Sequence, residues 1–277
     1  MFLRSFFSRL LEISRLIRYW QWQDKIRPLT VSVLILLLFT GQFMPQLKNF
    51  LLFEIYLYLT FTGSYLLNAY MDYKDDLSVG KRVGYLFNRE ATKIVIVGLA
   101  IVCLLFPALF ADIRILVLNF FMFLLAVLYS CPPVRLKERG IWGLIAASFT
   151  QRSPLLFFVF LIPQAVHLIL YIFVWQLLLG ILREISHLVN DYENDVKTKT
   201  TTLAVQIGLP KMEKIVYVLV QFILIYVALP AGYGIFTQQL QGVILTLLLF
   251  VFSHEAIYAN FYVFGFLNRF DQINRKL

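Results

Sequence analysis

The stretch NFLLFEIYLYLTFTGSYLLNAYMDYKDD, residues 49–76, joins a long apolar run to a cluster of polar side chains. The apolar part, residues 49–71, is long enough for a helix that crosses a bilayer, which takes about 20 residues. In such a helix Asn68, Asp72 and Asp76 recur every four residues and project from one face. Carboxylates on one face repel each other unless a cation lies among them, and Mg²⁺ prefers oxygen ligands. The stretch therefore predicts a membrane-spanning helix that ends in a metal site.

The same four-residue spacing returns at His187, Asp191 and Asp195, after a second long apolar run. Two carboxylates and one imidazole make a weak zinc site, because a third strong ligand is missing. We therefore expect His187 to hydrogen-bond a ligand or contact a substrate. A simpler interpretation of the first group stays open, in which its charges only keep the helix end out of the lipid. Asp75 faces another side of the predicted helix, and we expect it to be a surface carboxylate.

The composition predicts a polytopic membrane protein with an all-α fold. Of its 277 residues 60% are hydrophobic and 15% charged, and the mean hydropathy is +0.76, which excludes an ordinary soluble domain. Four prolines, Pro107, Pro154, Pro163 and Pro230, are expected to kink helices or mark their ends. We predict eight spans near residues 28–46, 49–71, 91–110, 113–130, 141–162, 164–189, 211–233 and 239–266.

Basic residues predict the orientation of these spans, because Lys and Arg accumulate in cytoplasmic loops. They gather before the first span, after the second, fourth and sixth, and at the C-terminus, whereas the alternate loops carry only Lys48 and Arg114. We thus expect a protein of a bacterial-type inner membrane. Both termini and both acidic motifs are expected on its cytoplasmic side. We attribute the formal charge of +9 to basic residues that set the membrane topology and attract anionic lipids. We expect no nucleic-acid partner. Cys103 and Cys131 give neither a disulfide framework nor metal-ligand spacing.

We expect residues 1–27 to form an amphipathic helix on the membrane surface, and residues 28–277 to form the transmembrane domain. The N-terminal segment alternates basic and apolar residues and lacks a cleavage site, so it does not resemble a signal peptide. An alternative is that Arg18, Lys25 or Arg27 enters a substrate site at the mouth of the first span.

Further candidates lie at the ends of spans and inside them. Tyr129-Ser-Cys-Pro-Pro-Val-Arg135-Leu-Lys137 closes the fourth span, where the prolines stop the helix. Arg152 lies inside the fifth span, where an arginine needs a polar cavity or a partner, and we favour lining of a substrate pocket. His254 and Glu255 in the last span are either a structural pair or part of that pocket.

Two acidic faces beside Lys and Arg at a membrane interface suit a diphosphate held through Mg²⁺. The carboxylates hold the metal, and basic side chains neutralise the charge that builds on the departing diphosphate. The apolar helices below can receive a lipid tail, and the abundant Phe and Tyr can stabilise a carbocation or simply pack.

Three motifs together resemble the UbiA-type intramembrane prenyltransferase superfamily. They are Asn68-x-x-x-Asp72-x-x-x-Asp76, the Tyr129–Lys137 stretch, and Asp191-x-x-x-Asp195 followed by Thr202-Leu-Ala-Val-x-x-Gly208. The resemblance implies a helical bundle around a central cavity, with eight spans here and commonly nine in the family. It also implies Mg²⁺-dependent transfer of an isoprenoid from a prenyl diphosphate to a lipophilic or aromatic acceptor. The chain departs from the family pattern at Ala69 and His187, where acidic residues are common, and it lacks an Arg-Pro-Leu after the first motif.

The resemblance also assigns roles by position. Asn68, Asp72, Asp76, Asp191 and Asp195 would hold metal and diphosphate, the four aspartates being catalytic. Diphosphate contacts are expected from Lys81, Arg82, Lys137 and Lys199, and further substrate contacts from Arg18, Tyr129, Arg152 and His187. Two alternatives remain open. One is phosphoribosyl transfer to a polyprenyl phosphate through the same metal site, and the other is a transporter or non-catalytic lipid-binding protein.

Overall fold

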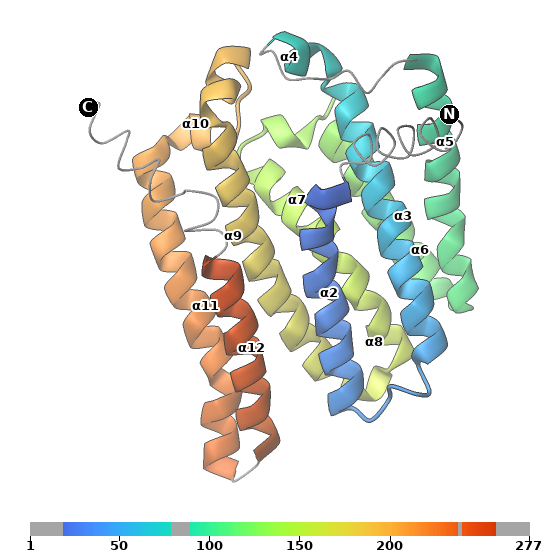
Figure 1. Cartoon of the computed structure of the whole chain (residues 1–277), viewed down its shortest axis with the longest axis vertical. Coiled ribbons are helices and arrows are strands. Elements are labelled where there is room, and N and C mark those ends of the chain that lie inside the picture. The colour runs from blue at the N-terminus through green and yellow to red at the C-terminus, as the bar shows by residue number, and fades with distance from the viewer. Residues whose placement is uncertain (1–18, 79–88, 238–239, 259–277) are drawn as a thin grey trace, which may run out of the picture. The chain divides into compact units, whose positions relative to one another are not determined.

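The computed structural model describes residues 19–78, 89–237 and 240–258, and every regular element in these ranges is a helix (Figure 1). An isolated bridge between Gly140 and Thr202 is the sole extended pairing among them. The described chain divides into two compact units. Unit 1 draws on residues 1–135 and 153–169, and unit 2 on residues 136–152 and 170–277.

Six stretches of the described chain are long and apolar enough to cross a membrane, fewer than the eight predicted. They are Leu47–Met71, Thr92–Phe110, Ile113–Ser130, Ile141–Leu161, Pro163–Thr198 and Leu209–Pro230. The predicted spans 28–46 and 239–266 are not among them. The helix over the first ends at Phe39, and the apolar helix Leu240–His254 in the second is shorter than the roughly 20 residues that a crossing needs.

Unit 1 is built on long helices that pack in chain order. Helix α3 contacts α2, α5 and α6, and α6 contacts α5 and α8. The elements of unit 1 are α2 (Tyr19–Phe39), α3 (Leu47–Met71), α4 (Tyr73–Ser78), α5 (Arg89–Leu105), η1 (Phe106–Phe110), α6 (Ile113–Ser130), η3 (Ser153–Leu156), α8 (Phe157–Leu161) and η4 (Pro163–Ala165). Three of the four prolines mark helix ends as predicted, since Pro107, Pro154 and Pro163 lie in 3₁₀ turns.

The core of unit 1 combines aromatic packing with one satisfied polar bridge. The ring of Phe157 lies 5.1 Å from that of Tyr56 and 5.6 Å from that of Phe110. The Tyr56 hydroxyl donates to Asn119 Oδ1 at 2.5 Å, and Asn119 Nδ2 donates to the Cys103 carbonyl at 3.1 Å. Hydrogen bonds of this kind join transmembrane helices, because lipid offers polar groups no alternative partner. The bridge fixes α3 against α5 and α6.

An exposed apolar stripe runs along α5. Ile94, Val97, Ile101 and Leu105 recur at helical spacing, and each is more than half exposed. Such a stripe on a soluble protein would be a large apolar patch, whereas in a bilayer it contacts lipid tails. The stripe agrees with the assignment of α5 as a membrane-spanning helix.

Unit 2 is held together by side chains of its longest helix. Helix α9 (Val166–Thr198) enters unit 2 at Leu170 and is accompanied by η2 (Leu136–Glu138), α7 (Ile141–Arg152), α10 (Leu203–Ile207), α11 (Leu209–Thr237) and α12 (Leu240–Tyr258). The rings of Tyr171 and Tyr226 stack at 4.6 Å, and each hydroxyl donates to the other residue's carbonyl. Trp175 Nε1 donates to Ser253 Oγ at 2.8 Å. These contacts join α9 to α11 and α12, which run side by side (Figure 1).

Candidate functional site

The first acidic motif lies at a break between two helices. Helix α3 ends at Met71, Asp72 caps it by donating its backbone N–H to the Asn68 carbonyl at 2.9 Å, and α4 begins at Tyr73. The prediction that Asn68, Asp72 and Asp76 project from one continuous helix is therefore wrong. The break changes the direction of the chain after Asp72. The side chain of Asp76 lies outside the described residues.

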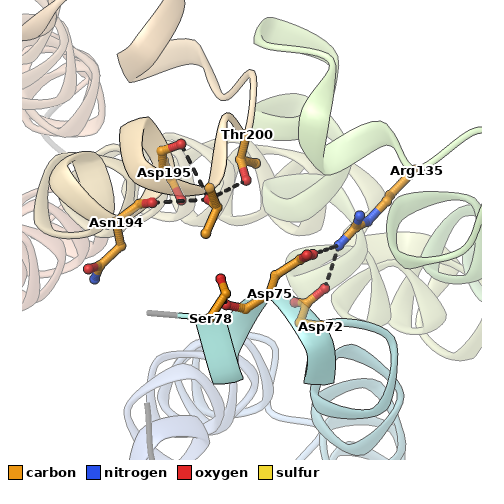
Figure 2. A network of polar contacts seen from close by, with 8 residues as sticks. Asp72, Asp75, Ser78, Arg135, Asn194, Asp195 and Thr200 are labelled. Atoms are coloured by element: carbon orange, nitrogen blue, oxygen red, sulfur yellow. Dashed lines mark hydrogen bonds and ion pairs between the residues drawn. The ribbon is translucent and has the colours of Figure 1, made fainter. Parts of the chain in front are cut away.

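Asp72 and Asp75 lie three residues apart across this break, and one arginine binds both. Arg135 Nη2 lies 2.9 Å from Asp72 Oδ1 and 2.9 Å from Asp75 Oδ2 (Figure 2). The two carboxylates are 27% and 48% exposed, so water and solutes can reach this ion pair. Asp75 was expected to be a surface carboxylate on another side of the helix. Its side chain is 48% exposed, and it shares Arg135 with Asp72.

The end of α6 supplies the other partners of this group. As predicted, the helix stops before the two prolines, and Ser130, its last residue, donates from Oγ to Asn68 Oδ1. Beyond it the Arg135 N–H donates to the Cys131 carbonyl at 2.9 Å, and Arg135 adopts a left-handed φ of 42°. This turn directs Arg135 back to the end of α3. We call Asn68, Asp72, Asp75, Ser130 and Arg135 the Asp72 cluster.

The second acidic motif lies at the end of α9, in unit 2. Asp195 Oδ2 accepts a hydrogen bond from Thr202 Oγ1 at 3.0 Å, and the Asp195 carbonyl accepts from the Thr200 N–H at 2.9 Å. Thr198 Oγ1 lies 2.8 Å from Thr200 Oγ1 and donates to the Asn194 carbonyl at 3.0 Å (Figure 2). The chain thus folds back over Asp195 after α9 ends. We call Asp195, Thr198, Thr200 and Thr202 the Asp195 cluster.

Two predicted phosphate-binding lysines lie on loops that this cluster joins. Lys137 is on η2, and Lys199 is in the turn after α9 with a left-handed φ of 57°. The Gly140–Thr202 bridge and a hydrogen bond from Thr201 Oγ1 to the Glu138 carbonyl at 2.5 Å connect the two loops. The structure therefore brings the chain segments that carry Lys137, Lys199 and Asp195 together within unit 2.

Gly143 lets α7 begin close to the loop that carries Lys137. A Cβ atom at Gly143 would lie 2.7 Å from the Leu136 carbonyl oxygen and 2.9 Å from Lys137 Cα. Because both neighbours are backbone atoms, we predict that Gly143→Ala displaces the loop and destabilises the protein by about 1–3 kcal/mol. Thermal unfolding in detergent measures the effect. Gly98→Ala in α5 is the matched control, since a Cβ there meets no atom within 4 Å. Equal melting temperatures for the two variants would contradict the prediction.

The remaining candidate residues lie on several different helices or outside the described residues. Asp191 is half-buried and His187 exposed on α9, and Tyr129 is half-buried near the end of α6. Arg152 is buried at the end of α7 in unit 2, where the absence of a side chain at Gly180 leaves room for it. His254 is exposed on α12, and the side chain of Glu255 is outside the described residues. Arg18, Lys81 and Arg82 also lie outside the described residues.

The two other basic candidates near the first span contact different parts of unit 1. Lys25 is buried, with Nζ 5.5 Å from the centre of the Tyr65 ring. Arg27 lines a cavity of about 240 Å³ with Glu54, which accepts a hydrogen bond from Thr30 at 2.9 Å. Glu54 precedes Asp72 by about five helical turns along α3. The cavity that Arg27 lines is therefore separate from the Asp72 cluster.

The donor chemistry of the two motifs fits a hard divalent cation. Asn68, Asp72, Asp191 and Asp195 offer the oxygen atoms that Mg²⁺ prefers. Within the described residues no three His, Cys, Asp or Glu side chains form a ready-made metal site. Three of these side-chain oxygens instead accept hydrogen bonds from the protein. Ser130 donates to Asn68, Arg135 to Asp72 and Thr202 to Asp195. A metal at either motif would share or replace these bonds.

Six residues of these clusters were not among the predicted site residues: Asp75, Ser130, Arg135, Thr198, Thr200 and Thr202. Asp75 follows Asp72 by three residues, a spacing that makes two side chains neighbours on a helix and could have indicated the pair. Arg135 and Ser130 lie inside the Tyr129–Lys137 stretch, and a basic residue after a helix stop is a usable signal. Thr202 follows the second motif, but its bond to Asp195 depends on a loop conformation that no spacing indicates.

Comparisons with known proteins point to one family. A model of the UbiA prenyltransferase family matches residues 29–261. The fold is similar to a UbiA homolog from Archaeoglobus fulgidus bound to DMAPP and Mg²⁺, with 16% identity, a TM-score of 0.62 and coverage of 88% of this chain and 85% of that one. For the same homolog bound to GPP and Mg²⁺ the identity is 15%, the TM-score 0.63 and the coverage 89% and 86%. A digeranylgeranylglyceryl phosphate synthase is 18% identical, with a TM-score of 0.58 and coverage of 94% and 99%. A search of curated proteins finds no match.

Proposed function

Because the chain belongs to the UbiA prenyltransferase family, we propose that it transfers an isoprenoid chain from a prenyl diphosphate to a lipophilic or aromatic acceptor within the membrane. The family assignment confirms the predicted enzyme class, an integral-membrane prenyltransferase. The identity of the donor, the acceptor and the metal is our proposal. It is supported by the A. fulgidus homolog, whose structures hold DMAPP or GPP together with Mg²⁺.

The observation that carries the proposal is the placement of carboxylates at the ends of two membrane-spanning helices, each next to basic residues. Asp72 follows α3 and pairs with Arg135, while Asp195 lies in the last turn of α9 near the loops of Lys137 and Lys199. An alternation of acidic and basic groups suits a metal-bound diphosphate, since carboxylates hold the cation and cations hold the phosphate oxygens. A transporter site would instead favour charges near the middle of the membrane.

We assign the site residues as follows. In this proposal Mg²⁺ is held by Asn68, Asp72, Asp76, Asp191 and Asp195, and the donor diphosphate is contacted by Lys81, Arg82, Lys137 and Lys199. Tyr129, Arg152, His187 and Arg18 are further substrate contacts. When bound, Mg²⁺ neutralises the diphosphate and favours its departure. The basic side chains stabilise the negative charge that grows on the leaving group.

Transfer requires one bond to break and one to form. The bond between the first prenyl carbon and the diphosphate oxygen breaks with both electrons on oxygen, which leaves an allylic carbocation. An electron-rich atom of the acceptor then bonds to that carbon and the acceptor loses a proton. Apolar helices hold the prenyl chain and exclude water, which would otherwise trap the cation. We further propose that the protein lies in a bacterial-type inner membrane with both termini on the cytoplasmic side.

A comparison of donors tests this function. We predict that membranes containing the protein incorporate radiolabel from a prenyl diphosphate into extractable lipid, and do not incorporate it from phosphoribosyl diphosphate. The expectation rests on the similar A. fulgidus homolog, whose structures hold the prenyl diphosphates DMAPP and GPP. Membranes without the protein serve as control. Labelling from phosphoribosyl diphosphate alone would favour transfer to a polyprenyl phosphate, and labelling from neither would favour a lipid transporter or binding protein.

A further inference from the structure

Arg135 is shared by two carboxylates that differ in their surroundings. Its Nη2 atom lies 2.9 Å from both Asp72 Oδ1 and Asp75 Oδ2 (Figure 2). Asp72 is 27% exposed and lies at the end of the membrane-spanning helix α3, whereas Asp75 is 48% exposed on α4. Asp72 belongs to the proposed metal site, and Asp75 has no assigned role there. The arginine thus bridges a proposed metal ligand and a second carboxylate.

A metal ion at Asp72 would change the strength of the ion pair between Asp72 and Arg135. Mg²⁺ would take electron density and charge from the Asp72 carboxylate and would repel the guanidinium beside it. The bond between Asp72 and Arg135 would weaken when the metal binds. Asp75 supplies a second carboxylate at the same 2.9 Å distance from Arg135 Nη2. The guanidinium can therefore keep one ion pair while Asp72 passes to the metal.

The backbone supports a fixed position for this arginine. Its left-handed φ of 42° and its N–H bond to the Cys131 carbonyl set where the side chain leaves the loop. Asp75 lies in the middle of the short helix α4, where Ser78 Oγ donates to its backbone carbonyl at 2.7 Å. Its carboxylate pairs with Arg135, which lies in the loop after α6.

We propose that Asp75 is a positioning residue that holds Arg135 next to the metal-bound donor, so that the guanidinium contacts the diphosphate. This inference rests on the proposed prenyl transfer. A planar guanidinium can form two parallel hydrogen bonds to phosphate oxygens, provided that its orientation is fixed. Asp75 fixes that orientation after Asp72 binds the metal. Loss of Asp75 should weaken donor binding and leave the metal site intact.

The test compares steady-state constants of Asp75 variants. Asp75→Asn is expected to raise the KM for the prenyl diphosphate about tenfold, with kcat and the Mg²⁺ concentration for half-maximal activity each within about twofold of wild type. Asp75→Glu, which keeps the charge, should restore most of the affinity. The melting temperature should not change. The control is Asp112→Asn, which removes a carboxylate that pairs with Arg114 at 2.7 Å at the opposite end of α6.

A double-mutant cycle with Arg135→Gln decides whether Asp75 acts through the arginine. Asp75→Asn should add no further increase in KM in the Arg135→Gln background, because the partner is already absent. An equal increase in both backgrounds, a shift in Mg²⁺ dependence, or a fall in melting temperature would each overturn the proposal. Wild-type protein that transfers no prenyl group would instead refute the proposed function, so the two failures are distinguishable.

Discussion

Asp72→Asn is expected to lower prenyl transfer by about a thousandfold while the protein remains folded. A bound metal supplies several kcal/mol of transition-state stabilisation, and each 1.4 kcal/mol corresponds to about a factor of ten in rate. The amide of asparagine keeps one oxygen but loses the negative charge that attracts both Mg²⁺ and Arg135. The fold should persist, because Asp72 caps α3 through its backbone N–H and not through its carboxylate.

The measurement is kcat/KM for a prenyl diphosphate, with melting temperature as a check on folding. Asp112→Asn is again the matched control, since it also removes an arginine-paired carboxylate and keeps an N-cap acceptor for α6. It lies about 27 Å from the Asp72 end of that helix. Asp191→Asn should reduce transfer as much as Asp72→Asn does. Full transfer by both motif variants would exclude the assigned metal site.

Chelation of divalent metal is expected to remove prenyl transfer completely and reversibly. In the described residues, protein donors bind Asn68, Asp72 and Asp195, so we expect these motifs to stay folded when the metal is removed. The diphosphate, in contrast, carries several negative charges that would lie next to two acidic motifs. Without a cation these charges repel, and the donor should not bind.

Activity in excess EDTA, followed by addition of Mg²⁺, measures this dependence. We expect activity to return with Mg²⁺ and to return weakly with Ca²⁺, because the larger ion prefers more ligands at longer distances. The melting temperature should stay constant during chelation, which separates loss of catalysis from loss of structure. Equal activity with and without EDTA would contradict a metal-dependent mechanism.

Much of the fold could be predicted from apolar length alone. The spans predicted at 49–71 and 113–130 coincide with α3 and α6 to within about two residues, because sharp polar boundaries end both runs. The helix stop at Pro132–Pro133 was likewise predictable, since proline lacks the N–H that a helix needs. The predicted count of eight spans is larger than the six that the described residues contain. The runs at 28–46 and 239–266 were delimited by weaker composition changes, and α2 ends seven residues before the predicted boundary.

The site was predictable in its residue types but not in its geometry. Four-residue spacing identified Asp72 and Asp195, yet the same spacing assumed that α3 continues to Asp76. The helix instead ends at Asp72, and Asp72 and Asp75, on either side of that end, share Arg135. The Thr202–Asp195 bond likewise depends on a loop that returns after α9. Periodicity describes regular helices, so contacts made where helices end require the structure.

One measurement tests the central claim most directly, namely a structure of the protein with Mg²⁺ and an unreactive prenyl diphosphate analogue. The account predicts Mg²⁺ between the diphosphate and the carboxylates of the acidic motifs, Asp72 or Asp195 among them, with the prenyl chain lying among the apolar helices. An analogue bound without contact to either aspartate, or bound in the same place when Mg²⁺ is absent, would contradict it.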